Sequence, residues 1–223
     1  SSYSVTGVQT CALPISAIPA GFGSRGSPWP AWWTRSGTSS GDRVTGIRGV
    51  VPRRVVLSYR IKSIFYSLQG EGAQVGRPAV FCRFSGCNLW SGHGADRSGA
   101  KCHFCDTDFV GVDGPGGRVF ETAGELARAL IRRWPSDDTP ARSECSSIRG
   151  PMVVCTGGEP LLQLDSSMIE ALHAVGFFIA VETNGTLAAP EGIDWLTVSP
   201  KAGTPLVQRS GDELKLEIGR AHV

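Results

Sequence analysis

Three of the seven cysteines lie in a glycine-rich stretch, and their spacing is that of metal ligands. Cys87, Cys102 and Cys105 follow the pattern C-x14-C-x2-C, with three glycines inside the longer interval. A C-x2-C pair lets two thiolates face one centre, and the glycines let the longer loop curl so that the third can join them. Disulfides are disfavoured, because three is an odd number and nothing in the sequence indicates secretion. Spacing alone leaves two centres open: a zinc site completed by His93 or His103, or a [4Fe–4S] cluster with one open iron.

The other cysteines carry no such signal. Cys82 and Cys155 lie within the apolar runs AVFCRF and MVVC, where a small buried side chain is the expected role. Cys145 lies in a polar stretch, and Cys11 belongs to an N-terminal segment discussed below. Only the three loop cysteines are therefore metal-ligand candidates.

Periodic segments that could position these cysteines begin at Tyr59. Short β-rich or apolar runs alternate with amphipathic ones, and turn residues separate them. The predicted strands are Tyr59–Ser67, Ala79–Phe84, Met152–Cys155, Phe177–Val181, Trp195–Val198 and Glu213–Leu216.

Two helices are predicted between these strands. A capping box, Thr122-x-x-Glu125, opens the first, and Pro135 stops it; Leu164–Val175 forms the second, followed by Gly176. Residues 136–149 are predicted to be a polar loop. Alternating strands and helices indicate a parallel sheet with right-handed crossovers. About 160 organised residues are too few for an eightfold barrel of about 250, so the predicted fold is α/β, either a partial barrel or an open sheet.

Polar, backbone-exposing residues follow three of the predicted strands. They are TGGEP at 156–160, ETNG at 182–185 and SPK at 199–201. The carboxyl ends of parallel strands meet at one edge of a sheet, so these segments should lie on the same rim as the cysteine loop. A polar cleft beside three thiolates looks like the site of a radical enzyme that uses S-adenosylmethionine.

Seven segments, in order, resemble the 7-carboxy-7-deazaguanine synthase family of radical S-adenosylmethionine enzymes. They are LQGEG (68–72), FCRFSGCNLW (81–90), CDTDF (105–109), TGGEP, ETNG, SPK and ELKL (213–216), and they span about Tyr59 to Leu216. The superfamily usually has the spacing C-x3-C-x2-C, and the x14 interval resembles a subset of this synthase family. The resemblance implies a partial (abbreviated) parallel β/α barrel of the radical S-adenosylmethionine type.

The resemblance also implies a reaction and its cofactors. The family is a carbon–nitrogen lyase of queuosine and 7-deazapurine biosynthesis, a tRNA modification pathway. It converts 6-carboxy-5,6,7,8-tetrahydropterin to 7-carboxy-7-deazaguanine and ammonia by radical ring contraction. The implied cofactors are a [4Fe–4S] cluster, S-adenosyl-L-methionine and Mg²⁺. An external one-electron reductant of flavodoxin or ferredoxin type, a homodimer when complete, and a cytoplasmic location follow from the same resemblance.

Site residues are implied by matching motifs, with no catalytic residue beyond the cofactors. Arg83 suits a substrate carboxylate because its fork binds two oxygens, and an oxygen ligand such as Thr107 suits Mg²⁺. Without the family, both are ordinary surface or turn residues, and Glu71 and Glu182 are solvated strand-end carboxylates. The implied sets are the cluster ligands Cys87, Cys102 and Cys105; Phe104, Cys105, Asp106, Gly157, Gly158, Ser199, Pro200 and Lys201 for S-adenosylmethionine; Leu68, Gln69, Gly70, Arg83 and Thr156 for the pterin; and Thr107 for Mg²⁺.

Two other functions fit part of the pattern. One is a radical-activating enzyme for a glycyl-radical partner protein, which would share cluster and cofactor but lack LQGEG. The other is a non-enzymatic zinc-binding module. Nucleic-acid binding is disfavoured, since residues 57–217 carry 15 basic and 19 acidic side chains, a net charge of −4. No apolar run approaches the roughly 18 residues of a membrane span.

Both ends of the sequence look like translated sequencing adapter. Val5–Ile15 (VTGVQTCALPI) and Glu217–Val223 (EIGRAHV) can be written in codons of which the second set is the reverse complement of the end of the first. Such segments are excluded from fold reasoning. We therefore expect residues 1–56 to be adapter-derived and upstream translated sequence without order, residues 57–217 to form the radical S-adenosylmethionine domain, and residues 218–223 to be an adapter-derived tail.

The predicted last strand, Glu213–Leu216, has no covering helix after it, although parallel strands are normally covered on both faces. The resemblance implies about one more βα unit. The expectation is therefore a C-terminally truncated domain that binds a cluster, turns over the pterin poorly and tends to associate through an open edge.

Deletion of residues 1–56 should leave the melting temperature of the remainder unchanged, because this Gly/Ser/Pro/Arg-rich segment lacks periodicity and buries too little to order itself. Thermal unfolding followed by circular dichroism of both chains measures this. A drop of many degrees would show that the segment packs on the core.

Overall fold

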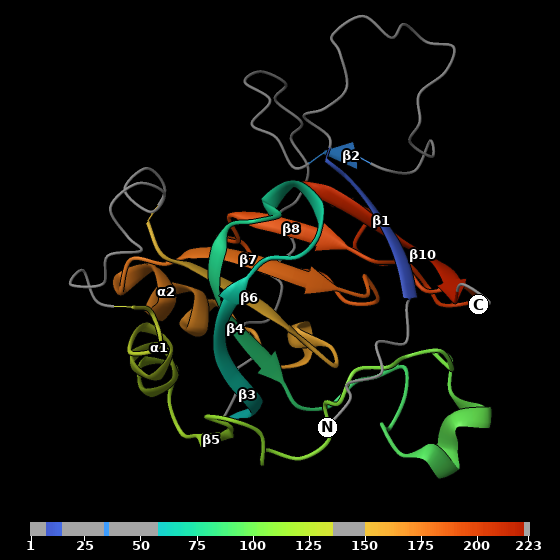
Figure 1. The fold of residues 1–223 in the computed structure, drawn as a ribbon, viewed down its shortest axis with the longest axis horizontal. Coiled ribbons are helices and arrows are strands. Elements are labelled where there is room, and N and C mark those ends of the chain that lie inside the picture. Colours follow the sequence, from blue (N-terminus) through green and yellow to red (C-terminus); the bar gives the residue numbers. More distant parts are fainter. Residues whose placement is uncertain (1–7, 15–33, 36–57, 136–149, 221–223) are drawn as a thin grey trace, which may run out of the picture.

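A computed structural model of the chain describes residues 8–14, 34–35, 58–135 and 150–220. Most of these residues form an eight-stranded, mostly parallel sheet with two helices on one of its faces (Figure 1), and residues 34–35 and 210–211 pair in a separate two-stranded sheet. In the described part, no helix is long and apolar enough to cross a bilayer. The strands are β1 (Val8–Pro14), β2 (Thr34–Arg35), β3 (Tyr59–Leu68), β4 (Pro78–Phe84), β5 (Arg118–Phe120), β6 (Met152–Gly157), β7 (Phe178–Thr183), β8 (Trp195–Val198), β9 (Ser210–Gly211) and β10 (Glu213–Arg220).

The main sheet has the strand order β1-β10-β8-β7-β6-β4-β3-β5. Its centre is parallel, because β4, β6, β7, β8 and β10 pair in the same direction. Two antiparallel strands, β3 and β5, complete one edge, and β1 pairs antiparallel with β10 at the other. The carboxyl ends of β4, β6, β7 and β8 therefore meet at one rim, as the strand-end motifs predicted, and β10 begins beside the end of β8.

Side-chain alternation along the strands separates a packed face from a polar face. In β4, Val80, Cys82 and Phe84 are fully buried in the main apolar cluster, which also contains residues of both helices. Phe81 and Arg83 point the other way and line the pocket described below. The burial of Cys82 and of its register partner Cys155 confirms that these two cysteines belong to the core.

Both helices begin at a side-chain cap. Thr122 Oγ1 accepts a hydrogen bond from the amide of Glu125 and starts α1 (Ala123–Ile131), as the capping box predicted. Asp165 caps α2 (Ser166–Ala174), so this helix starts two residues later than predicted. Gly176 follows it with a φ of +86°, a left-handed conformation that favours glycine after a helix.

The expected alternation of strands and helices holds only for the first half of the sheet. A helix separates β5 from β6 (α1) and β6 from β7 (α2), but the connections from β7 to β8 and from β8 to β10 contain none. These connections carry Gly185, Pro190, Gly192 and Pro205, which break a helical pattern. Strand β5 was not predicted, because three residues show no clear periodicity.

Strand β1 contradicts the expectation that residues 1–56 lack order, and deleting these residues would remove the partner of β10, so the premise for an unchanged melting temperature does not hold. It pairs with β10, with Cys11 opposite Leu216 and Leu13 opposite Leu214. Strand β10 also continues to Arg220, beyond the predicted end at Leu216 and into the expected tail at 218–223. The unpaired edge of β10 offers amide and carbonyl groups to any extended segment, which gives this pairing a physical cause. Residues 1–7, 15–33, 36–57, 136–149 (with Cys145) and 221–223 lie outside the described residues.

The Asp165→Ala variant should lose more stability than Thr122→Ala, although both remove a helix cap. Asp165 Oδ1 accepts hydrogen bonds from the Met168 amide (2.9 Å) and from the buried Tyr59 hydroxyl (2.8 Å). Losing a cap costs about 1 kcal/mol, and a buried hydroxyl left without its partner costs roughly 1–3 kcal/mol more. Denaturant unfolding of both variants measures the difference, and equal losses would contradict it.

Candidate active site

A pocket of about 550 Å³ opens at the carboxyl ends of the parallel strands. Its walls come from the end of β3, from β4, β6 and β7, from the cysteine loop and from the segment after β8. Every site residue named from the sequence lines this pocket except Pro200, so the structure brings almost the whole predicted set together.

The cysteine loop closes on itself before it reaches the second and third thiols. The amides of Lys101 and Cys102 both donate to the carbonyl of Leu89, at 3.0 and 3.5 Å. Arg97 lies 4.0 Å over the Trp90 ring and donates to the carbonyls of His103 (2.7 Å) and Cys105 (3.0 Å). The long interval between the first two thiols is thus a folded unit that returns the chain to the pocket.

The three thiols differ in their electrostatic surroundings. The Cys102 thiol donates to the Cys105 sulfur, and the Thr107 amide and hydroxyl donate to it as well, which lowers the pKa of Cys105 to about 6. Burial raises the pKa of Cys87 above its ordinary value, against the effect of amide hydrogen bonds. Cys105 therefore has thiolate character near neutral pH, the form that binds metal.

The sequence left two kinds of metal centre open at these thiols, a [4Fe–4S] cluster and a single zinc ion. Within the described ranges, no three His, Cys, Asp or Glu side chains converge closely enough to hold one ion. A zinc site needs about four ligands at roughly 2.0–2.3 Å from one point, and in a [4Fe–4S] cluster each thiolate binds its own iron. His93 and His103, the possible fourth zinc ligands, are exposed and do not line the pocket.

The glycine pair at the end of β6 has a structural role that the sequence did not indicate. A β-carbon on Gly157 would collide with the backbone of Phe84, and one on Gly158 with the carbonyl of Gly86, just before Cys87. The amides of Gly158 and Glu159 donate to Phe84 and Gly86 at 3.2 and 2.9 Å. The pair therefore lets β6 pack directly on the backbone that leads to the first thiol.

Glu159, which the sequence did not single out, is fully buried behind this pair. Its Oε1 accepts from the Leu161 amide (2.9 Å) and the Thr183 hydroxyl (2.8 Å), and its Oε2 from the Asn184 amide (2.8 Å). Burial raises the pKa of Glu159, and these hydrogen bonds oppose the rise. Asn184 in turn donates to Asn88 Oδ1 at 3.0 Å, which ties the cysteine loop to the end of β7.

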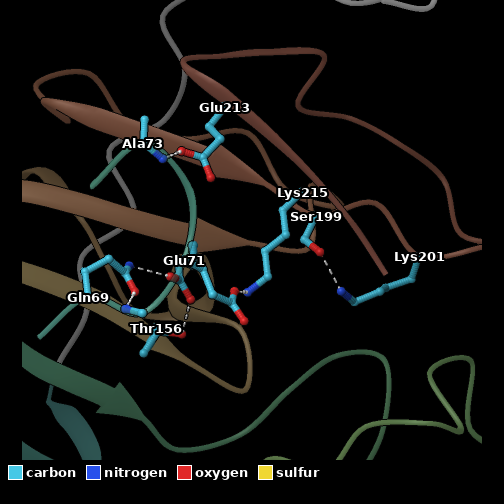
Figure 2. Close-up of polar contacts among 10 residues, drawn as sticks. Gln69, Glu71, Ala73, Thr156, Ser199, Lys201, Glu213 and Lys215 are labelled. Carbon is cyan, nitrogen blue, oxygen red and sulfur yellow. Dashed lines mark hydrogen bonds and ion pairs between the residues drawn. The ribbon is translucent and has the colours of Figure 1, made fainter. Parts of the chain in front are cut away.

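Glu182 connects Gln69 and Thr156, two residues assigned to the pterin, whose side chains lie near each other in Figure 2. Gln69 Nε2 donates to its Oε1 and the Thr156 hydroxyl to its Oε2, both at 3.0 Å. Gln69 Oε1 also accepts from the Gly70 amide at 2.8 Å. Sequence reasoning gave Glu182 only a weak expectation of contact, and it lines the pocket and joins two strand ends.

Two lysines also line the pocket. Lys201 Nζ donates to Ser199 Oγ at 2.8 Å, within the predicted SPK motif. Lys215 lies on β10 and forms a 2.6 Å ion pair with Glu71 Oε2. Lys215 belongs to the ELKL motif, to which the sequence assigned no role. On a strand it lies two residues after Glu213, on the same face, and this position was the signal that could have placed it beside the pocket.

A mostly parallel sheet with a three-cysteine loop and a polar pocket at its carboxyl rim is the arrangement expected from the sequence for a radical S-adenosylmethionine enzyme. No protein-family model matches the chain. The chain is 59% identical to 7-carboxy-7-deazaguanine synthase of Nitratidesulfovibrio vulgaris over 160 residues, which are 72% of this chain and 71% of that protein. It is also 59% identical to the synthase of Caulobacter vibrioides over 162 residues, 72% of this chain and 71% of that protein.

The chain belongs to the 7-carboxy-7-deazaguanine synthase family. A more distant relative, the synthase of Bacteroides thetaiotaomicron, is 41% identical over 157 residues, 70% of this chain and 69% of that protein. The crystal structure of QueE from Escherichia coli aligns with a TM-score of 0.45 and 24% identity over 66% of this chain and 61% of that one. The resemblance found in the motifs is confirmed, and the chain is an enzyme, a lyase.

Replacing Cys87, Cys102 or Cys105 by Ala should abolish both the brown iron–sulfur chromophore and S-adenosylmethionine cleavage after anaerobic reconstitution. Cys82→Ala and Cys155→Ala are the matched controls and should retain both, because these thiols are fully buried in the core. Iron and sulfide content and the visible spectrum measure the outcome. A Cys102→Ala protein with full iron and full cleavage would overturn the ligand assignment.

Proposed function

We propose that this chain converts 6-carboxy-5,6,7,8-tetrahydropterin to 7-carboxy-7-deazaguanine and ammonia, in queuosine and 7-deazapurine biosynthesis. The observation that carries the proposal is a single pocket in which three thiols face a set of arginine, carboxylate and amide groups. The names of the relatives support the same reaction. The substrate proposed for this pocket belongs to the class of small planar molecules that carry a carboxylate.

The thiol side of the pocket suits the cofactors. Cys87, Cys102 and Cys105 would hold a [4Fe–4S] cluster, and Gly158, which lines the same pocket beside Cys87, would meet S-adenosylmethionine through its backbone. When bound together, these cofactors supply a carbon-centred radical that can remove a hydrogen atom from the substrate. Phe104, Ser199 and Lys201 line the neighbouring wall, and we assign them to S-adenosylmethionine. The protein's own task is to position the reactants and exclude water.

The opposite side suits a pterin carboxylic acid. Arg83 offers a planar fork to the carboxylate. Glu182 offers acceptor oxygens to the N–H groups of the aminopyrimidinone edge, with Gln69 and Thr156 fixing its orientation. The parallel rings of Phe65 and Phe81, 5.2 Å apart, give an apolar wall for a flat ring system. Polar groups thus fix the orientation of the ring, and the apolar wall excludes water.

Further parts of the proposal rest on the family resemblance. Thr107 lines the pocket beside Arg83, and we assign its hydroxyl to a Mg²⁺ ion that also binds the substrate carboxylate. A flavodoxin or ferredoxin supplies the electron, and the enzyme works in the cytoplasm as a homodimer.

The test is anaerobic incubation of the reconstituted chain with reductant, S-adenosylmethionine and the pterin, with the product identified by mass spectrometry. Arg83→Met should weaken pterin affinity by about 10- to 100-fold, the effect of charge-assisted hydrogen bonds to a carboxylate. It should leave S-adenosylmethionine cleavage in place. Arg118→Met, which removes an exposed cation from β5, is the matched control.

Two results would count against this function. A chain that cleaves S-adenosylmethionine but never consumes the pterin, and modifies a partner protein instead, would be a radical-activating enzyme. A colourless protein with bound zinc and no iron after reconstitution would be a zinc-binding module.

A further inference from the structure

Two charged residues of β10 reach back to the turn between β3 and β4. Glu213 and Lys215 are two residues apart on a strand, so their side chains leave the same face of the sheet. Residues 69–76, here called the pocket turn, are closed at the base by hydrogen bonds from Gln69 N to the Arg77 carbonyl (2.9 Å) and from Gly76 N to the Gln69 carbonyl (2.7 Å). The turn and the two β10 side chains are far apart in sequence and adjacent in space (Figure 2).

Glu213 anchors the middle of the pocket turn. Its side chain is buried, with 4% of the residue exposed, and its Oε2 accepts from the amide of Ala73 at 3.1 Å. Gly72 has a φ of +69°, and a β-carbon there would collide with the Glu213 carboxylate. The turn therefore packs its backbone directly against a carboxylate, and only glycine fits at position 72.

Lys215 anchors the pocket side of the same turn. Its side chain is 16% exposed, and its Nζ lies 2.6 Å from Glu71 Oε2, while the Glu71 side chain is 43% exposed. Lys215 lines the main pocket together with Gln69, Gly70 and Glu71. Partial burial of the lysine makes this ion pair more consequential than a pair on the open surface.

The turn is held from its other side by β7. Gln69 uses its amide nitrogen to bind Glu182 and its amide oxygen to bind the Gly70 amide. The backbone of residues 69–73 is therefore fixed between Glu182 and the two β10 side chains. Two backbone hydrogen bonds already close the base of the turn. Burying the Glu213 carboxylate costs free energy, and closing the turn alone does not require it.

We propose that Glu213 and Lys215 are positioning residues for the substrate: they hold the pocket turn so that Gln69 and Gly70 face the pterin. This inference rests on the proposed function and adds residues that act through the turn rather than by contact. Lys215 acts through Glu71, and Glu213 acts through the Ala73 amide.

Lys215→Met should weaken pterin affinity about tenfold, as expected for one charge-assisted contact, with S-adenosylmethionine affinity unchanged. Lys215→Arg keeps the cation and should restore most of the affinity. Glu71→Gln should have a similar effect to Lys215→Met, and the double variant should be no weaker than either single one. Arg128→Met on the exposed face of α1 is the control for loss of a cation. Additive losses in the double variant would mean that Lys215 contacts the substrate directly and would overturn the proposal.

Amide hydrogen exchange of the reconstituted chain without the pterin separates this inference from the proposed function. Lys215→Met and Glu213→Ala should speed exchange at Ala73 and in the rest of the pocket turn, but not at the amides of α1. Unchanged exchange in both variants would overturn the inference whatever the substrate is. Faster exchange with unchanged pterin affinity would overturn the positioning role. If the unsubstituted chain neither binds nor converts the pterin, the proposed function fails, and exchange still decides whether the two side chains hold the turn.

Discussion

The site depends on the hydrogen bonds of Glu159, a carboxylate with no access to solvent. Burying a charge is unfavourable unless hydrogen bonds replace water, and Glu159 accepts three, from two strand ends. The Gly157–Gly158 pair brings its backbone against the residues before Cys87. One side chain thus joins the ends of β6 and β7, and the position of the first thiol follows from that junction.

The end of β7 carries this constraint across the pocket. Three consecutive residues serve different neighbours: Glu182 joins Gln69 and Thr156, Thr183 donates to Glu159, and Asn184 joins Asn88 of the cysteine loop. Glu182 and Asn184 are two positions apart and line the same pocket, while Thr183 between them binds Glu159, so one short segment can hold both halves of the site. The spacing between the thiol side and the proposed substrate side is therefore a property of the strand rather than of a mobile loop.

Local signals in the sequence predicted much of this arrangement. The capping box located α1, and three strand-end motifs placed their residues on the rim that the structure shows. Links between residues far apart in sequence left no local pattern: Glu182 meets Gln69 across 113 positions, and Lys215 meets Glu71 across 144 (215 minus 71). Strand β1 was missed for a related reason, since its order depends on the open edge of β10 rather than on its own composition.

The closed base of the cysteine loop has a consequence for how such a loop can change in length. Since Lys101 and Cys102 bind the carbonyl of Leu89, residues 91–100 form a side branch whose two ends are fixed together. Lengthening the branch moves neither Cys87 nor Cys102, and loop-closure entropy rises only by about 0.6 kcal/mol per doubling. Lengthening the interval between the first two cysteines from 3 to 14 residues would cost about 1.3 kcal/mol of loop-closure free energy on that scale. The stacking of Arg97 on Trp90 and the two hydrogen bonds from Arg97 to backbone carbonyls can offset this cost. Insertions can therefore accumulate in this branch, beside the three thiols, without disturbing Cys87 and Cys102 at its base.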